Sequence, residues 1–396
     1  MPMSSDRPEE LALLAAIREE IPAVSVAPYL NCGTAGPLPR RAVDAMQSKL
    51  AEELNLGRIR PTVMETFHTL REELRQTLAR RLHCDEGEVA LTGRTTDGMN
   101  IALWGLSLLP GDEVLTTRHE HNGLLVPLAA LARARGVAVR YVDWPQERPD
   151  LAIEAFERAI TSRTRLLAFS HVLWTNGAVL PVREIAERAH AAAALVLIDG
   201  AQSAGAVPLD LSTLGADFYS LPGQKWLMGP EGTGALYAAR DAQALCHPTF
   251  TGYLSTAGVD PNAANFLPSA GARRYEVGSG LPAALVGQLE SLRWQETVGE
   301  DWALGRIAAL AHELREAVVE IPGIDVLSPE GQASGIVSFR IPGISAPDAA
   351  KRLHERGLLV RFLPEPHAAV RVSAGFYVLR EELARLVDAV RELADG

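Results

Sequence analysis

Leu195-Val196-Leu197-Ile198-Asp199-Gly200-Ala201-Gln202 is the stretch that decides the fold of this 396-residue chain. Its first four residues are apolar on both faces, which is typical of a central strand in a parallel sheet. Other short β-rich runs lie on either side and alternate with Ala/Leu/Arg-rich stretches of helical spacing. The alternation predicts an α/β unit with a mainly parallel, seven-stranded sheet covered by helices on both faces. The seven runs are Glu88–Thr92, Glu113–Thr117, Val137–Val142, Arg165–Ser170, Leu195–Ile198, Asp217–Ser220 and Gly234–Ala239.

A second, smaller unit is predicted in the carboxyl-terminal part of the chain. It follows a Gly/Pro/Ala/Asn-rich stretch, Tyr253–Pro282, whose composition indicates an extended loop. We expect residues 31–295 to form the large domain and residues 296–396 a small α+β domain. Residues 1–30, with a helix around Leu11–Glu20, should pack with the small domain. The expected elements of the small domain are helix Asp301–Glu320, strand Ile336–Ile341, helix Ala346–Arg356, strands near Leu358–Arg361 and Ala369–Ser373, and helix Arg380–Leu393.

Bulk properties exclude several classes of protein. A net charge of −11 argues against a basic surface for nucleic acid or an anionic membrane. The longest apolar run, Ala191–Ile198, is too short to span a bilayer. The three cysteines are far apart and form no CxxC pair, so neither a disulfide framework nor a metal site is predicted. Acidic residues near the N-terminus do not fit a signal peptide, so we expect a cytoplasmic protein.

Asp199 and Lys225 carry the strongest chemical signal. Asp199 ends an apolar strand, and ligands of open α/β sheets collect beyond the carboxyl ends of the strands. A strand-end aspartate also commonly caps the next helix. Lys225, one of only three lysines, is flanked by Trp, Leu and Met and then by the glycine-rich segment Gly229–Gly234. Desolvation in such surroundings lowers the pKa of a lysine, as Schiff-base chemistry requires, whereas an ordinary surface lysine keeps its charge in water.

Two loop segments complete the pattern. Thr95 and Thr96 precede a helix expected to begin near Asp97, where hydroxyls and unpaired backbone N–H groups can cradle a phosphate or cap the helix. His121 follows the run Glu113–Thr117, where an imidazole can stack on a planar ring or stay solvated. Each signal is ambiguous by itself, but their order along the chain is specific.

Taken together, these segments resemble the class V aminotransferase family of fold-type I enzymes, which use pyridoxal 5′-phosphate (PLP). The likeness extends from Tyr29 to Tyr377. Its strongest parts are Asp199-Gly-Ala-Gln202, Gly215-Ala-Asp217-Phe-Tyr, Lys225-Trp and Gly229-Pro-Glu-Gly-Thr-Gly234.

The resemblance implies a role for each residue around the PLP ring. Lys225 would hold the cofactor as a Schiff base and then shuttle the Cα proton of the substrate. Asp199 would pair with the pyridinium nitrogen and so keep the ring electron-accepting. Gln202 would contact the phenolic oxygen of the ring, and His121 would lie over the ring.

The resemblance also implies contacts at the two ends of the site. Thr95 and Thr96 would hold the phosphate. Arg371 matches the arginine that clamps the substrate carboxylate, for which a bidentate guanidinium is suited, and Asn31 would lie beside the substrate. The family is usually a homodimer, and Tyr275-Glu-Val-Gly-Ser279 resembles a segment that reaches the phosphate site of the neighbouring subunit, with Ser279 as the contact.

The chain departs from the cysteine desulfurases of this family in three places. They carry a histidine directly before the lysine, where this chain has Gln224, and a hydroxyl residue three positions before it, where this chain has Pro222. The Gln224 amide can replace part of the missing phosphate contact. Desulfurases also have a longer loop with a persulfide-forming cysteine, whereas residues 360–367 form a short segment without cysteine. We therefore expect no persulfide relay.

The closest resemblance is to the cysteine/cystine C–S lyase branch, which implies β-elimination from a small sulfur amino acid. Transamination, epimerisation as in the isopenicillin N epimerase-like branch, and cleavage of a larger sulfur conjugate remain alternatives. A catalytically dead PLP-fold binding protein is disfavoured because Lys225, Asp199 and Arg371 are all retained. A dinucleotide-dependent dehydrogenase is disfavoured because no GxGxxG follows the first strand.

Overall fold

The computed structural model describes residues 6–331 and 334–395. Its largest sheet has the strand order β1-β7-β6-β5-β4-β2-β3, and neighbouring strands are parallel except for β7, which is antiparallel to both β1 and β6. The predicted mainly parallel, seven-stranded sheet is thus confirmed. The strands are β1 (Val89–Thr92), β2 (Glu113–Thr117), β3 (Ala138–Val142), β4 (Thr164–Ser170), β5 (Leu195–Asp199), β6 (Phe218–Pro222) and β7 (Gly234–Ala238).

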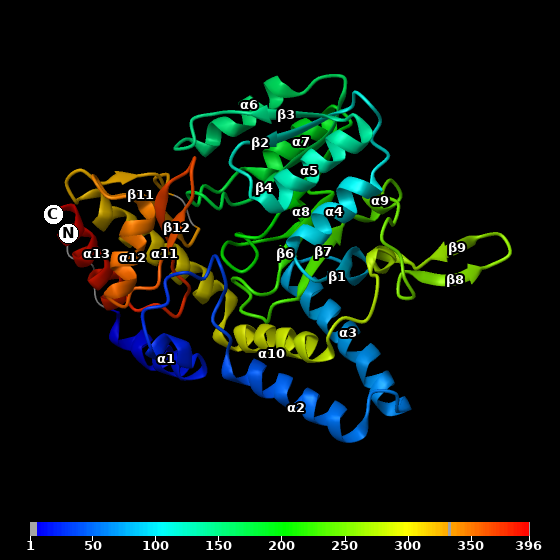
Figure 1. Ribbon diagram of the computed structural model, residues 1–396, viewed down its shortest axis with the longest axis horizontal. Coiled ribbons are helices and arrows are strands. Elements are labelled where there is room, and N and C mark those ends of the chain that lie inside the picture. Colours follow the sequence, from blue (N-terminus) through cyan, green and yellow to red (C-terminus); the bar gives the residue numbers. More distant parts are fainter. Residues whose placement is uncertain (1–5, 332–333, 396) are drawn as a thin grey trace.

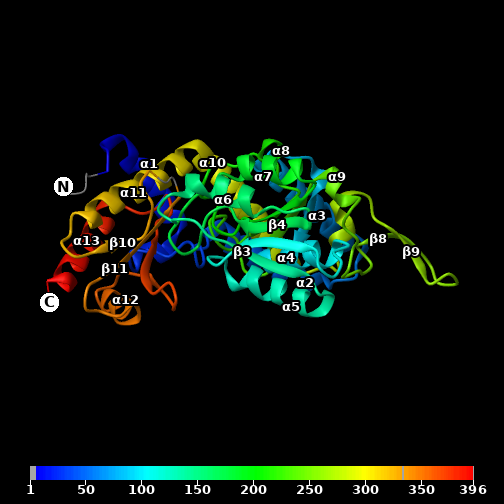
Figure 2. The same cartoon turned by 90° about the horizontal axis from the view of Figure 1, so that it is seen from above.

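Helices cover both faces of this sheet because its central strands are apolar on both sides. The helices of this part are α2 (Arg40–Leu56), α3 (Pro61–Arg81), α4 (Thr95–Gly105), α5 (Asn122–Arg135), α6 (Ala152–Ala159), α7 (Val182–Ala191), α8 (Leu211–Leu214), α9 (Arg240–Gln243) and α10 (Pro282–Val298). Figure 2 shows α4 and α5 on one face and α6 and α7 on the other. Two buried apolar clusters correspond to these two faces. Long helices α2 and α10 pack side by side (Figure 1).

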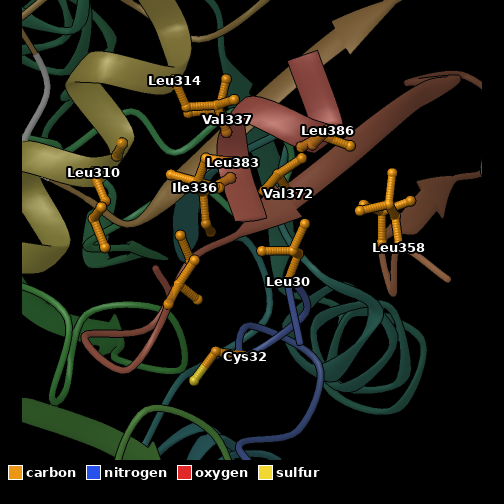
Figure 3. Close-up of a cluster of buried hydrophobic side chains, with 14 of the residues drawn as sticks. Leu30, Cys32, Leu310, Leu314, Ile336, Val337, Leu358, Val372, Leu383 and Leu386 are labelled. Carbon is orange, nitrogen blue, oxygen red and sulfur yellow. The ribbon is translucent and has the colours of Figure 1, made fainter. Parts of the chain in front are cut away.

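A smaller group of elements lies at one end of the sheet, and α1 packs with it (Figure 1). Arg18 of α1 forms an ion pair of 2.8 Å with Glu382 of α13, and Ile17 of α1 belongs to a buried apolar cluster of the carboxyl-terminal elements. Figure 3 shows part of this cluster, in which Leu30 and Cys32 join side chains of the carboxyl-terminal elements. The division into domains at residues 30 and 295 stays a prediction, part of which falls on residues 1–5, 332–333 and 396, outside the described residues. The elements are α1 (Pro8–Glu20), α11 (Glu300–Val319), β10 (Asp325–Val326), β11 (Ile336–Arg340), α12 (Ala346–Glu355), β12 (Arg361–Leu363), β13 (Ala369–Ser373) and α13 (Arg380–Ala394), with sheet order β10-β11-β13-β12.

Several expectations need correction. The segment Tyr253–Pro282 is not only loop: β8 (Thr256–Asp260) and β9 (Asn265–Pro268) form an antiparallel hairpin, and a 3-10 helix covers Gly271–Tyr275. The hairpin extends away from the body of the molecule, so its strands lack the buried apolar alternation that predicts a strand (Figures 1 and 2). Strand β12 begins at Arg361, where the predicted strand ended, because its pairing with β13 sets its position.

The turn between β6 and β7 positions the functional lysine. Pro222 at the end of β6 pairs with Gly234 at the start of β7, and Lys225 lies in the connection between them. The loop near the N-terminus closes over this turn, where the Gly36 amide donates to the Gln224 carbonyl at 2.7 Å. A Cβ on Gly36 would lie 2.1 Å from the Lys225 carbonyl oxygen, so only glycine allows this approach.

Candidate active site

A cavity of about 280 Å³ lies beyond the carboxyl ends of the parallel strands, between the large sheet and the carboxyl-terminal elements. Its lining residues come from eight segments of the chain. All but two of the residues proposed from the sequence line it, and the two that do not are Asn31 and Ser279. The lining residues are Gly33, Thr34, Arg94, Thr95, Thr96, His121, Gly123, Trp174, Asp199, Ala201, Gln202, Pro222, Gln224, Lys225, Arg361 and Arg371.

Lys225 lies in a desolvated part of this cavity, which agrees with its predicted chemistry. Burial lowers the pKa of its amine to about 8; the Asp199 carboxylate opposes this change, and the Arg371 guanidinium adds to it. A larger neutral fraction of the amine makes Lys225 a better nucleophile than an ordinary lysine at neutral pH.

Asp199 ends β5 and is almost completely buried, with 4% of its surface exposed. Its Oδ1 accepts a hydrogen bond of 2.8 Å from the Ala201 amide, which fixes the carboxylate at the cavity wall. Burial raises the pKa of Asp199, and the Lys225 ammonium lowers it. The two groups therefore form a charge pair within the cavity.

Thr95 and Thr96 occupy the first turn of α4, which begins two residues earlier than expected. The first N–H groups of a helix have no partner within the helix and attract anions. Ser220 of β6 donates to the Thr95 carbonyl at 2.8 Å and so fixes the start of α4 against the sheet. This end of the cavity suits a phosphate group.

His121 caps α5, and its side chain lines the cavity. Its Nδ1 accepts a hydrogen bond of 3.0 Å from the Gly123 amide, so in the neutral ring the proton is on Nε2. Desolvation lowers the pKa of His121 to about 4, and the positive charge of Lys225 acts in the same direction. The Trp174 ring packs edge-on against the imidazole with centroids 5.3 Å apart. His121 is thus held as a neutral flat ring, as stacking on a planar ligand requires.

Arg371 and Arg361 approach each other across the strand pair β12–β13, where they are directly opposite. Both donate to Thr34 Oγ1, Arg361 at 2.9 Å and Arg371 at 3.1 Å. Arg371 also donates to the Trp174 carbonyl at 3.0 Å, while its buried Nε has no partner among the described residues. Burial lowers the pKa of Arg371 to about 9, with Arg361 adding to the effect. Two neighbouring guanidinium groups without an acidic partner form a site for a carboxylate.

Asn31 does not reach the cavity itself. Its Oδ1 accepts a hydrogen bond of 2.7 Å from Thr34 Oγ1, the hydroxyl that both arginines contact. Asn31 therefore acts on the arginines through Thr34, and direct substrate contact by Asn31 stays a prediction.

The two predicted glutamines differ in how firmly they are held. Gln202 donates to the Gly33 carbonyl at 2.8 Å and accepts from Trp226 Nε1 at 3.0 Å, so its amide is fixed at the cavity wall. The buried Oε1 of Gln224 has no hydrogen-bond partner within the described residues. Such an unpaired buried atom is unusual and indicates a group completed by a ligand or by water.

Ser279 lies apart from the cavity of its own chain. It lines a separate cavity of about 270 Å³ together with Lys49, Tyr253 and Leu281. Tyr275, at the start of the same predicted segment, does not line the cavity of Lys225 either, and it packs in the apolar cluster that includes side chains of α4. The contact of Ser279 with a neighbouring subunit stays a prediction.

Three further residues of the cavity were not found from the sequence. Arg361 was placed at the end of a predicted strand without a role, and Thr34 and Arg94 were given no role. Arg94 and Arg361 both line the cavity, and a search for arginines near the predicted site segments would have found both. Thr34 gives no such signal, because its role depends on contacts with residues more than 300 positions away.

The residues present fit PLP. Lys225 faces a buried carboxylate, a neutral imidazole lines the same space, and the start of a helix offers amides and hydroxyls for a phosphate. The unpaired Gln224 Oε1 and Arg371 Nε are polar groups that a bound ligand would satisfy.

Comparisons with known proteins agree with this geometry. The sequence model of the family "Aminotransferase class-V" matches residues 29–386. Isopenicillin N epimerase of Streptomyces clavuligerus is 32% identical over 379 residues, which are 92% of this chain and 94% of that protein. A "Probable cysteine desulfurase" of Mycolicibacterium paratuberculosis is 33% identical over 343 residues, 82% of this chain, and this chain spans about half (49%) of that relative's length.

Solved structures give the same answer for the fold. The complex of the cystine C–S lyase C-DES with its reaction product cysteine persulfide is 28% identical, has a TM-score of 0.88, and covers 95% of this chain and 99% of that one. A variant of C-DES was solved with glycine covalently linked to its PLP cofactor, and it has a TM-score of 0.89. No helix in the described part of the chain is long and apolar enough to cross a membrane. The chain therefore belongs to the class V aminotransferase family of fold-type I enzymes, and it is a PLP-dependent enzyme similar to cysteine desulfurases and C–S lyases.

Proposed function

We propose that this enzyme breaks the C–S bond of cysteine, cystine or a related sulfur amino acid by β-elimination, without forming a persulfide on one of its own cysteines. The single observation that carries the proposal is the chemistry of its three thiols, none of which lines the cavity around Lys225 among the described residues. Burial raises the pKa of Cys32 and of Cys84 to about 12, and that of Cys246 to about 11. Cys32 Sγ lies 3.9 Å from the Lys225 carbonyl oxygen, but Cys32 is buried outside the cavity lining, and a protonated thiol that does not face the cavity does not accept sulfur.

The residues of the cavity supply binding and proton transfer for this reaction. Arg371 and Arg361 bind the substrate carboxylate, which places Cα near the Lys225 amine. Neutral Lys225 removes the Cα proton, and Asp199 holds the negative charge that balances a protonated ring nitrogen. Bound PLP supplies the electron sink for the charge that develops at Cα. The thiolate or persulfide of the substrate is then the leaving group, and hydrolysis of the remaining aminoacrylate gives pyruvate and ammonia.

PLP itself would be held by residues at both ends of the cavity. Lys225 is the attachment point, Asp199 the partner of the ring nitrogen and His121 the stacking group, while Gln202 lies at the wall beside them. Thr95 and Thr96, with the first N–H groups of α4, would hold the phosphate, and Gln224 would add an amide donor. We also propose a homodimer in which Ser279 contributes to the phosphate site of the neighbouring subunit.

The likeness to C-DES supports elimination, and the likeness to isopenicillin N epimerase supports epimerisation as the second candidate. Both reactions begin with removal of the Cα proton, so the fate of that carbon separates them. The test is to incubate the PLP-loaded enzyme with cysteine, cystine and alanine, and to measure sulfide, pyruvate and the configuration of the remaining amino acid.

Pyruvate formed from cysteine or cystine without an added keto acid is the expected result. Strict dependence on a keto acid would instead identify an aminotransferase, and loss of optical purity without pyruvate would identify an epimerase. Mass spectrometry after turnover should find no added sulfur on the protein, and a stoichiometric persulfide on any of the three cysteines would overturn the proposed mechanism.

A further inference from the structure

Glu120 is a buried carboxyl group directly before the stacking His121, and the roles proposed above leave it unused. Only 2% of its surface is exposed. Thr117 donates its hydroxyl to Oε1 at 2.6 Å, and the Ser170 hydroxyl donates to Oε2. Its hydrogen-bond partners within residues 6–331 and 334–395 are hydroxyl and amide groups of Thr117 and Ser170, and no cation is among them. A buried carboxylate without a cation is costly.

A second buried carboxyl lies on the neighbouring strand. Ser170, which contacts Glu120, is the last residue of β4, and it is directly opposite Asp199 at the end of β5. Glu120 and Asp199 therefore both lie beside Ser170, and because both are buried, little water screens their charges from each other. Two such carboxyl groups do not both ionise readily, and they share protons as a pair.

The other titratable groups around this pair do not supply a compensating charge to Glu120. Buried His171, next to Ser170, has its pKa lowered to about 4 by desolvation and is neutral at pH 7. Tyr219 of β6 contacts His171 and Ser203, and burial raises its pKa, so it stays protonated. Flanking His119 is also neutral, because burial lowers its pKa to about 4.

Lys225 pairs by charge with Asp199, so the two carboxyl groups are not equivalent. Burial raises the pKa of Glu120 to about 7, and the Asp199 charge acts in the same direction. The proton shared by the pair therefore belongs with Glu120.

We infer that Glu120 is a positioning residue that holds a proton in the folded enzyme, so that the single negative charge of this carboxyl pair stays on Asp199, where the PLP ring nitrogen binds. As a carboxylic acid, Glu120 donates to one of its two hydroxyl neighbours, and each of these can accept a hydrogen bond. An ionised Glu120 would instead repel the Asp199 charge and favour protonation of Asp199. Glu120 serves Asp199 in this way whichever bond of the substrate is broken.

The experiment compares thermal unfolding of full-length, PLP-loaded wild type, Glu120→Gln and Glu276→Gln between pH 5 and 8.5. Glutamine keeps the shape of a protonated glutamate and cannot ionise. In the unfolded chain Glu120 loses its proton near pH 4.5, and in the folded chain it does so only near 7, so wild type loses stability relative to Glu120→Gln as the pH rises through this interval. We expect Glu120→Gln to match wild type near pH 5 and to have the higher Tm at pH 8.5.

Glu276 is the matched control because it is equally buried but ion-paired. It accepts hydrogen bonds from Arg75 at 2.5 Å and from the Leu91 amide at 2.8 Å, also contacts Arg71, and has its pKa lowered by these arginines against the effect of burial. Glu276→Gln should lower the Tm at every pH above 5. If Glu120→Gln behaves in the same way, Glu120 is ionised and the inference is wrong.

A second measurement does not depend on a variant that folds. Infrared spectra of the PLP-loaded wild type in D₂O at pH 6 should contain the C=O band of a buried carboxylic acid, and the band should disappear as the pH rises through 7. Glu120→Gln should lack it. A wild-type spectrum without such a band at pH 6 would overturn the proton assignment.

Discussion

The side chains around Lys225 carry more positive than negative charge. Lys225, Arg361 and Arg371 face the same cavity as one carboxylate, Asp199, and the guanidinium groups have only hydroxyl and carbonyl partners. Like charges placed directly opposite each other on paired strands are destabilising. An anionic amino-acid substrate relieves this repulsion, so the uncompensated charge is part of how the site selects its ligand.

The first prediction concerns Lys225 itself. Lys225→Ala should abolish the visible absorbance band of covalently bound PLP, because no other lysine lines the cavity in the described part of the chain. The measurement is an absorbance spectrum after PLP loading, followed by borohydride reduction and mass analysis of peptides. Lys351→Ala, at an exposed position of α12, is the control and should keep the band. A reduced PLP adduct on Lys49 or Lys351 in wild type would contradict the assignment.

The second prediction is a pH dependence of cofactor loading. Covalent attachment needs the neutral amine, and burial lowers the pKa of Lys225 to about 8, so the loading rate of cofactor-free enzyme should rise with pH to a midpoint near 8. The Arg371 charge contributes to the lowering, and Arg371→Gln should therefore move the midpoint to a higher pH. Stopped-flow absorbance measures both. An unchanged midpoint in Arg371→Gln would show that the Arg371 charge does not contribute to the lowered pKa of Lys225.

Among the elements, helix α4 packs very closely on β6, because its first turn lies against the end of that strand. Gly98 makes this possible: a Cβ at residue 98 would lie 2.2 Å from Ser220 Oγ, the hydroxyl that binds the Thr95 carbonyl. The phosphate end of the cavity thus depends on close packing of a helix on a strand.

We predict that Gly98→Ala destabilises the protein by about 1–3 kcal/mol, the usual cost of overpacking a core. It should also weaken PLP binding, because α4 has to move away from Ser220. Urea unfolding and PLP titration measure the two effects. Gly305→Ala is the matched control, since this exposed glycine of α11 has no atom within 4 Å of an added Cβ and the change should stabilise the helix by roughly 0.5–1 kcal/mol. Equal effects of the two substitutions would exclude a special role of Gly98.

At the scale of the whole molecule, several large apolar side chains remain exposed on the side where the β8–β9 hairpin extends. Phe250, Tyr253 and Leu281 each expose more than half of their surface, and Tyr253 and Leu281 line the same cavity as Ser279. Exposed apolar residues that gather in one region are typical of an interface. They support the proposed homodimer.

We predict that light scattering will give the mass of a dimer in solution, in which Ser279 of one subunit completes the phosphate site of the other. Ser279→Ala should keep the mass of a dimer but weaken PLP affinity by roughly ten- to a hundredfold, since loss of one hydrogen bond to a charged group costs about 1.5–3 kcal/mol. Ser162→Ala, in an exposed turn, is the control. A monomer that binds PLP equally well with alanine at position 279 would refute the shared site.

The sequence predicts much of this molecule because many decisive features are local. The apolar run of β5 is followed directly by Asp199, and Lys225 is followed directly by its glycine-rich turn, so both could be placed without tertiary information. Arg361 could not, because its role depends on the β12–β13 register that places it opposite Arg371. The hairpin β8–β9 was missed because it is solvated and shows no buried face.

The burial of the three thiols affects how the protein reacts with oxidants and with alkylating reagents. Cys32 and Cys246 are enclosed, and all three thiols are protonated at neutral pH, so the enzyme should resist iodoacetamide and peroxide at concentrations that inactivate enzymes with exposed thiolates. Sulfur released in the cavity would leave as a diffusible product. The reductant in the surrounding solution, and not a protein side chain, would then decide whether it is recovered as sulfide or as persulfide.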